Sequence, residues 1–127
     1  MIIGIGVDIA DIRRFEKLVK RYGDRLAKRI LSEAELVEFG QNKNPAAFLA
    51  KRFAVKEATA KAFGTGFGKG LHPRQIGLGH NELGAPHLLL TDKAELAIKR
   101  LGCNQSHVSL SDEKEHAIAF VVLSRTE

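Results

Sequence analysis

Residues 44–66 read NPAAFLAKRFAVKEATAKAFGTG, and they predict the longest helix of the chain. Asn44 is a favoured N-cap residue, and Pro45 suits the first helical position, where its missing N–H costs nothing. Good helix formers then continue to Phe63, and Gly64 is typical of the residue just beyond a helix C-terminus. We therefore expect one long central helix on which the other elements pack.

A short strand is expected ahead of this helix. Residues 2–7, IIGIGV, are apolar and predict a largely buried strand with Asp8 at its end. Gly4 and Gly6 lie within this strand, where a missing side chain often marks the close approach of another backbone. The strand should therefore contact a neighbouring element closely.

A basic helix follows the strand. Asp11 can act as its N-cap, and Gly23 ends it. Helical spacing places Phe15 and Tyr22 on its apolar face, so we assign both to the core. The cations of this helix and of the short helical stretch after it are Arg13, Arg14, Lys17, Lys20, Arg21, Arg25, Lys28 and Arg29, against the two acids Glu16 and Asp24. Such a face can be simply solvated, but the excess of one sign indicates a docking surface for an anionic partner.

The remaining elements are short. Ser32 and Glu35 form a capping box that opens a brief helix ending at Gly40. Residues 64–70, GTGFGKG, are too rich in glycine for regular structure and form a loop. The other expected elements are strands over 76–80 and 87–90, a helix after Thr91 that Gly102 ends, and a hairpin of strands over 107–111 and 116–123. The fold class is α+β, with an antiparallel sheet wrapped on the long central helix.

Length and composition favour one domain that spans residues 1–127. The single Cys103 excludes a disulfide framework and suits a reducing, cytoplasmic location. No apolar run approaches the roughly 20 residues that a membrane span requires, so we expect no membrane partner. The 20 Lys and Arg against 15 Asp and Glu give a net charge of +5, which favours anionic partners. A nucleic acid is a poor candidate, because aromatic residues make up only 6% of the chain.

Glu57 is the residue of the long helix that most needs an explanation. It shares a helix face with apolar residues, and burying a carboxylate without a partner is costly. The simple interpretation is an ion pair with Lys61, one turn further along the helix. The alternative is a magnesium site shared with Asp8, because Mg²⁺ takes one or two protein carboxylates and completes its shell with water and phosphate. Spacing alone leaves both interpretations open.

Two further patterns could serve phosphate binding. The glycine loop fails the P-loop pattern, since Phe63 stands where the first glycine belongs and Gly70 follows Lys69. Composition alone makes this loop a turn or a lid. His107 and Ser109 alternate onto one face of their strand, which is either solvated or lines a pocket. In a pocket, both side chains would contact a phosphate or a base.

Taken together, these motifs resemble the holo-acyl-carrier-protein synthases. The matching segments are GIGVDI at 4–9, RFAVKEA at 52–58, KA at 61–62, GTG at 64–66 and HVS at 107–109, in the order and spacing of that family. The resemblance implies a phosphopantetheinyl transferase, which moves 4′-phosphopantetheine from coenzyme A to a serine of apo acyl carrier protein and releases adenosine 3′,5′-bisphosphate. It also implies dependence on Mg²⁺, a role in fatty acid biosynthesis, and a homotrimer with active sites at subunit interfaces.

The resemblance implies roles for individual residues as well. Asp8 and Glu57 match the metal ligands and Lys61 matches a phosphate contact, which makes these three the catalytic set. The positions implied to hold coenzyme A are Arg52, Lys61, Gly64, Thr65, Gly66, Pro86, His107 and Ser109. Arg14 and Arg21 match positions that contact the carrier protein, and we add Arg13 and Lys17 of the same basic helix to the predicted carrier-binding residues. Two positions depart from the family: Ala85, where members often carry lysine, and Asp112, where some carry histidine.

The base that takes the proton of the carrier serine is left open between a metal-bound water and a ligand carboxylate such as Glu57. An idle subunit that only binds carrier protein or coenzyme A is the competing interpretation. The intact set of Asp8, Glu57 and Lys61 argues against it, because a protein that only binds has no use for a metal site.

Overall fold

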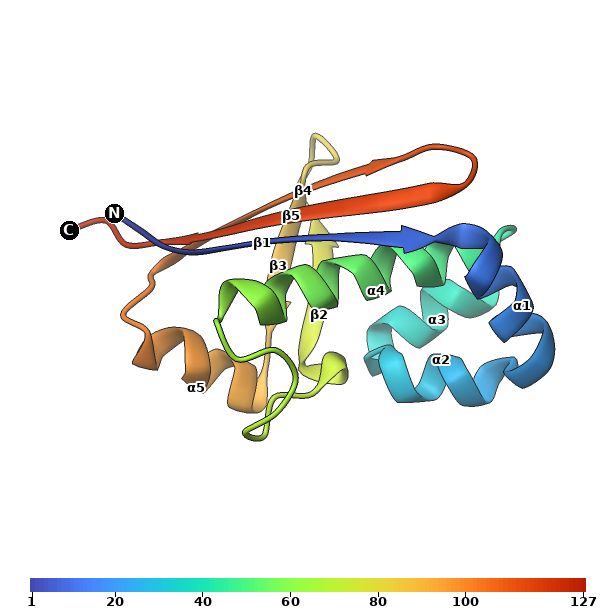
Figure 1. Ribbon diagram of the computed structural model, residues 1–127, viewed down its shortest axis with the longest axis horizontal. Coiled ribbons are helices and arrows are strands. Elements are labelled where there is room, and N and C mark those ends of the chain that lie inside the picture. The colour runs from blue at the N-terminus through green and yellow to red at the C-terminus, as the bar shows by residue number, and fades with distance from the viewer.

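The long helix α4, Pro45–Ala62, runs through the centre of the computed structural model, which describes all 127 residues (Figure 1). Asn44 caps it as expected, because its Oδ1 accepts a hydrogen bond from the Ala47 N–H at 3.2 Å. Helical bonding stops at Phe63, and Gly64 follows with a φ of 83°. Most side chains of α4 are buried, so the helix is the centre of the core. No helix, α4 included, is both long and apolar enough to cross a membrane.

A three-stranded antiparallel sheet covers α4. Its strands are β1 (Ile2–Asp11), β5 (His116–Ser124) and β4 (Gln105–Asp112), in the order β1–β5–β4 (Figure 1). Asp8 therefore lies inside a strand and not at its end, which corrects the expectation from sequence. The physical reason is that β5 pairs with β1 along its whole length, as far as Asp11 opposite His116.

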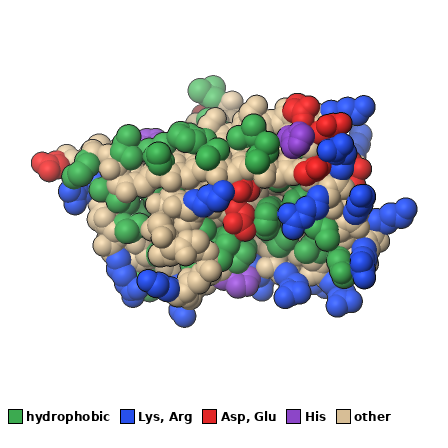
Figure 2. Space-filling model, in the orientation of Figure 1, with side chains coloured by type: hydrophobic (Ala, Val, Ile, Leu, Met, Phe, Trp, Pro, Cys, Tyr) green, Lys and Arg blue, Asp and Glu red, His purple; other side chains and the backbone are tan.

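The sheet buries only one of its faces. Glycine, alanine and larger aliphatic residues of β1 and β5 are buried toward α4, whereas the alternate residues point away from it. β1 is thus not largely buried, as the sequence suggested, but half-buried. The outward-facing hydrophobic side chains, 42–60% exposed, are Ile5, Val7, Ile9, Ile118 and Phe120. We call these five residues the outer apolar face; a row of hydrophobic side chains follows this edge of the molecule in Figure 2.

The predicted close approach at Gly4 and Gly6 is confirmed. A Cβ atom at Gly4 would overlap the carbonyl oxygen of Ala62, and one at Gly6 would overlap that of Ala58. Both carbonyls belong to α4, so β1 lies directly on the helix backbone with no side chain between them. This contact fixes how far Asp8, two residues beyond Gly6, stands from the helix.

Three short helices pack at one end of α4 (Figure 1). They are α1 (Ile12–Tyr22), α2 (Asp24–Ile30) and α3 (Glu33–Gln41). The predicted caps form: Asp11 accepts from the Arg13 N–H, and Ser32 and Glu35 make the full capping box. Phe15 is buried as expected, but Tyr22 is 40% exposed because it lies in the last turn of α1.

The region after α4 forms a second, separate sheet where one sheet was expected. The glycine-rich loop leads through a short 3₁₀ helix, Pro73–Gln75, into β2 (Ile76–His80), which pairs antiparallel with β3 (Pro86–Leu90). Helix α5 (Asp92–Arg100) follows and ends before Gly102. The predicted β4–β5 hairpin then completes the fold.

Replacing Gly6 by Ala should destabilise the fold by about 1–3 kcal/mol or more, because the new methyl group forces β1 away from α4. Denaturant unfolding monitored by circular dichroism measures this loss. Gly40→Ala is the matched control, since Gly40 lies in α3 with open space around its Cα. It should leave stability unchanged or raise it by up to about 1 kcal/mol. Equal unfolding midpoints for both variants would contradict the backbone contact.

Candidate active site

Asp8, Glu57 and Lys61 come together where β1 crosses α4. Asp8 points from the helix-facing side of β1, and Glu57 and Lys61 stand one turn apart on α4. The Lys61 ammonium lies 3.0 Å from Asp8 Oδ1 and donates to the Val7 carbonyl oxygen at 2.9 Å. Lys61 thus pairs with Asp8 on the neighbouring strand, and the simple Glu57–Lys61 ion pair along the helix does not form.

The carboxyl group of Glu57 has an unusual electrostatic environment. Burial raises its pKa above the ordinary range, and the negative charge of Asp8 raises it further, while Lys61 offsets part of the effect. Two carboxylates therefore share one partly buried space with a single ammonium group between strand and helix. An added cation would relieve the repulsion between them.

The donor set suits a hard divalent cation with few protein ligands. No group of three or more His, Cys, Asp or Glu side chains is arranged to hold a metal ion, so the site offers two carboxylates only. Mg²⁺ fits such a pair, because it commonly keeps several waters and takes further oxygens from substrate phosphates. Zinc, which prefers three or four His or Cys ligands, does not fit.

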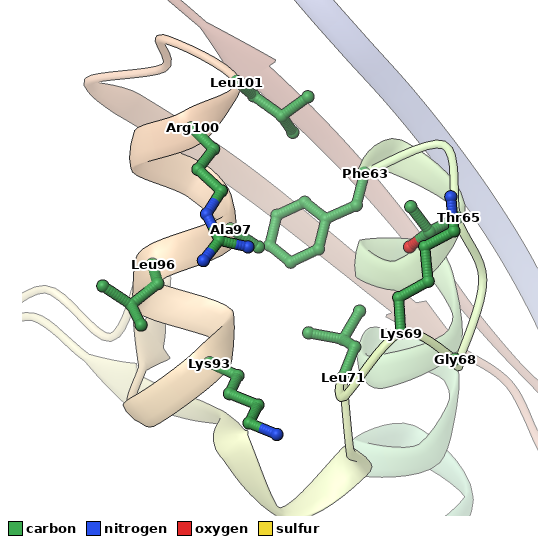
Figure 3. A pocket seen from close by; sticks show the side chains of 10 residues that line it. All are labelled: Phe63, Thr65, Gly68, Lys69, Leu71, Lys93, Leu96, Ala97, Arg100 and Leu101. Carbon is green, nitrogen blue, oxygen red and sulfur yellow. The ribbon is translucent and has the colours of Figure 1, made fainter.

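The glycine loop begins one turn after Lys61. Gly64 and Gly66 both adopt positive φ, 83° and 62°, and nothing lies within 4 Å of either position where a side chain would stand. Thr65 is exposed between them. The backbone is therefore open to a ligand at these three residues. On its other side the loop borders a cavity of about 450 Å³ against α5 (Figure 3).

Arg52, which the resemblance assigns to coenzyme A, also has partners within the chain. Its side chain is buried, and its guanidinium donates to Glu35 Oε2 at 3.1 Å and to Glu38 Oε2 at 2.9 Å. It also stacks over Phe48 at 4.6 Å from the ring centre. The structure does not bring Arg52 to Asp8, Glu57 and Lys61, because α4 points it toward α3 instead.

Lys56 and Glu35 complete this buried ionic network; the sequence predicted Glu35 only as part of the capping box and gave Lys56 no role. Lys56 is only 1% exposed; its ammonium lies 2.7 Å from Glu35 Oε1 and also donates to the carbonyl oxygens of Pro73 and Ile76. Burial lowers the pKa of Lys56, and Glu35 partly restores it. For Glu35, burial is outweighed by Lys56, Ser32 and Arg52, so its pKa is lowered. The sequence signal for this network was the one-turn spacing of Arg52 and Lys56, which places two cations on the same face of α4.

His107 and Ser109 lie on the opposite side of the sheet from Asp8. Both point outward from β4, beside the outer apolar face, where Ser109 pairs with Phe120 across the strands. The His107 Nε2 atom is 3.2 Å from the Ser124 hydroxyl. Pro86 opens β3 in the second sheet. Within one chain, then, the residues implied to hold coenzyme A are divided between two faces.

The two positions that depart from the family also have defined places. Ala85 lies in the exposed β2–β3 turn, where its N–H donates to Asn81 Oδ1 at 2.9 Å. Asp112 ends β4, with its carboxylate 3.8 Å from the Lys51 ammonium of α4. Asp112 thus joins sheet and helix by an ion pair.

The predicted docking surface is a cluster of exposed cations at the α1–α2 end of the molecule (Figure 2). Arg14, Lys17 and Arg21 have no acidic partner, whereas Arg13 lies 3.3 Å from Asp11 and 3.8 Å from Glu115. Arg13 is therefore partly neutralised within the chain. The other three are free to meet an anionic surface.

Known proteins resemble this chain along nearly its whole length. Residues 4–121 match the family model of the 4′-phosphopantetheinyl transferase superfamily. The holo-[acyl-carrier-protein] synthase of Nitrosococcus oceani is 52% identical over 97% of this chain and 80% of its own length. The crystal structure of the Neisseria meningitidis synthase superposes with a TM-score of 0.93 at 42% identity, covering 98% of this chain and all of that one.

A Helicobacter pylori synthase crystallised in complex with coenzyme A superposes with a TM-score of 0.81 at 34% identity, covering 94% of this chain and 99% of that chain. Solved structures of these relatives thus confirm the predicted α+β fold, in which an antiparallel sheet packs on one long helix. With a family model and relatives that span nearly its whole length, the chain belongs to the holo-[acyl-carrier-protein] synthases of the 4′-phosphopantetheinyl transferase superfamily.

Proposed function

We propose that this chain transfers the 4′-phosphopantetheine group of coenzyme A to a serine of apo acyl carrier protein, the reaction that supplies holo carrier protein for fatty acid biosynthesis. The observation that carries this proposal is the convergence of Asp8, Glu57 and Lys61 beside the open glycine loop. The full-length similarity to named synthases supports it, as does the coenzyme A complex of the Helicobacter pylori protein.

Asp8 and Glu57 would hold Mg²⁺ in this proposal. When bound, the ion would supply positive charge to the phosphoryl oxygens of coenzyme A and to the leaving group. Its two protein ligands leave most of the coordination shell for water and phosphate oxygens, as a substrate-binding ion requires. The raised pKa of Glu57 also supports cation binding, since an added positive charge offsets the repulsion from Asp8.

Other groups of the chain would bind the phosphates and accept the proton of the serine. The Lys61 ammonium, 52% exposed, can turn from Asp8 toward a phosphate and stabilise negative charge on its oxygens. The open backbone at Gly64, Thr65 and Gly66 suits the close approach of a phosphate. A ligand carboxylate such as Glu57 is a candidate to accept the proton of the attacking serine. The nucleophile itself belongs to the carrier protein.

The surface formed by Arg14, Lys17 and Arg21 would receive the acidic carrier protein. α1 begins directly after β1, so these cations stand close along the chain to Asp8. Opposite charges on two partners speed their encounter and orient them, and the effect weakens as salt screens the charges. Arg13 contributes less, because Asp11 and Glu115 already compensate it.

We also propose that the chain assembles as a homotrimer through the outer apolar face. Contiguous exposed hydrophobic side chains usually mark an interaction site, and this face includes Phe120 at 44% exposure. The division of the implied coenzyme A contacts supports assembly as well. His107 and Ser109 stand on the outer side of the sheet, so a neighbouring subunit is needed to bring them to another chain's Asp8 and Glu57.

Intact-mass spectrometry tests the reaction directly. Apo acyl carrier protein is incubated with this protein, coenzyme A and Mg²⁺, beside a sample that contains a chelator. We expect a metal-dependent mass gain of one phosphopantetheine on serine. No gain, despite measured binding of either partner, would favour an idle subunit that binds without catalysis.

Replacing Glu57 by Gln should abolish transfer, by at least about 100-fold, and should make the fold more stable at pH 7. A carboxyl group with a raised pKa in the folded state binds protons more tightly there than in the unfolded chain. The protonated carboxyl group therefore stabilises the fold at low pH, and this stabilisation is lost as the pH rises above the pKa of Glu57 in the unfolded chain, roughly 4. Gln removes this penalty at pH 7, and the two proteins should converge near pH 4.

Transfer rates and urea unfolding at pH 7 and pH 4 check both parts of that prediction. Glu95→Gln, at an exposed position of α5, is the control and should change neither. Near-normal turnover of Glu57→Gln at saturating Mg²⁺ would refute its role as a ligand.

Replacing Arg14 by Glu should raise the KM for carrier protein roughly tenfold and leave the KM for coenzyme A nearly unchanged. The effect should shrink at high salt, since the interaction is electrostatic. Lys99→Glu makes the same change of charge on α5, at the other end of the molecule (Figure 1), and should affect neither constant. Equal effects of Arg14→Glu on both substrates would discredit the docking surface.

Replacing Phe120 by Glu should convert the trimer to monomers and remove most activity, because a charge in the centre of the outer apolar face cannot be buried unpaired. Analytical ultracentrifugation measures the mass, and the transfer assay measures the activity. Leu83→Glu is the control, since Leu83 is 95% exposed at the tip of the β2–β3 turn, outside that face. An unchanged mass for Phe120→Glu would show that the chain does not associate through this face.

A further inference from the structure

Among the residues that line the cavity between the glycine-rich loop and α5, only Thr65 is also assigned to the reaction described above. The cavity volume of about 450 Å³ lies within the usual range for small-molecule sites. Asp8, Glu57 and Lys61 do not line it. Its walls come from the end of α4, from the loop that follows and from one face of α5, as Figure 3 shows.

One side of this cavity is apolar. Phe63 and Leu71 are buried at its base, and the Phe63 ring projects into the space between loop and helix (Figure 3). Across from them, Leu96 and Leu101 of the α5 segment remain 51% and 38% exposed. These side chains offer hydrophobic surface that nothing within the chain covers, and an apolar ligand group would bury it.

The rest of the cavity is positively charged. Lys69, Lys93 and Arg100 line it, no acidic side chain does, and none of the three makes an ion pair. The position of Lys93 is set by the loop: a Cβ at Gly70 would come within 2.7 Å of Lys93 Cδ, so its stem lies across the glycine. Three uncompensated cations around an apolar base favour a ligand that is anionic at one end.

We propose that this cavity binds a small amphipathic anion, with one carboxylate or phosphate head joined to an alkyl or aryl body. The head would meet Lys93 or Arg100 of α5, with Lys69 on the opposite side of the cavity (Figure 3), and the body would lie on Phe63, Leu71 and the exposed leucines. A cationic ligand is excluded by like charge, and a purely polar anion leaves the apolar surface uncovered. The inference does not depend on the transferase reaction.

Binding measured on the whole protein tests this proposal, with shifts in ¹H–¹⁵N NMR spectra as the readout. The probes are octanoate and octyl phosphate, which share the apolar body and differ in the head. Octylamine has the same body with a positive charge, and acetate has the head without the body. We expect saturable shifts with octanoate or octyl phosphate, confined to residues 63–71 and 92–101, and the tighter probe identifies the head group. Octylamine and acetate should not bind.

A charge-reversed variant supplies the second part of the test. Lys93→Glu with Arg100→Glu should weaken anion binding at least tenfold and leave the fold intact, since both side chains are exposed. Lys99→Glu is the matched control, because Lys99 lies on the same helix but faces Glu95 outside the cavity. It should bind the anion as the wild type does.

Three results of these binding measurements would overturn the proposal, and a competition with coenzyme A supplies a fourth. The three are the absence of saturable shifts with either anion, equal binding of octylamine, and unchanged affinity in the double variant. Saturating coenzyme A should leave the anion bound. Displacement by coenzyme A would mean that the cavity holds part of that molecule and is no separate site.

Discussion

The backbone contact between β1 and α4 is the constraint on which the site depends. Gly4 and Gly6 leave no side chain between the strand and the helix carbonyls, so the two backbones touch. Asp8, on the same face of the strand, is consequently held within reach of Lys61 and beside Glu57. Any side chain at either glycine would move the first carboxylate away from the second. The geometry of the site therefore depends on two glycines, which allow the strand to contact the helix backbone.

A second constraint holds the other side of α4. The buried network of Glu35, Arg52 and Lys56 ties α3 and the start of β2 to this helix. Ions removed from water gain little net stability, but a partner lost from such a network leaves a buried charge uncompensated. The network therefore fixes the orientation of the helix more than it strengthens the fold. Glu57 follows Lys56 directly, so that orientation also directs Glu57 toward β1.

Local signals in the sequence were sufficient to predict the helices and strands, but not the contacts between residues far apart in the chain. Asn44–Pro45 and the Ser32–Glu35 capping box act within a few residues, and both were predictable. Lys61 pairs with Asp8, more than fifty positions away in the sequence, and not with Glu57 on the same helix. Helical spacing cannot predict such a pairing. Ile5, Val7 and Ile9 alternate along β1, but the predicted strand ended at Asp8, so its exposed face was not predicted. The ion pairs of Arg52 depend on the packing of α3 against α4, which no local sequence pattern predicts.

The pairing of β1 with β5 has a consequence for the order in which the protein is made. β1 leaves the ribosome first among the elements, yet its hydrogen-bonding neighbour is the last strand, with Asp8 opposite Ala119. Contacts between such distant segments form late, because closing a long loop costs entropy before any pairing repays it. Helices α1 to α4 can form during synthesis, whereas the strand that carries Asp8 waits for β5. A nascent chain therefore acquires both carboxylates early but assembles them into one site only after synthesis has passed β5.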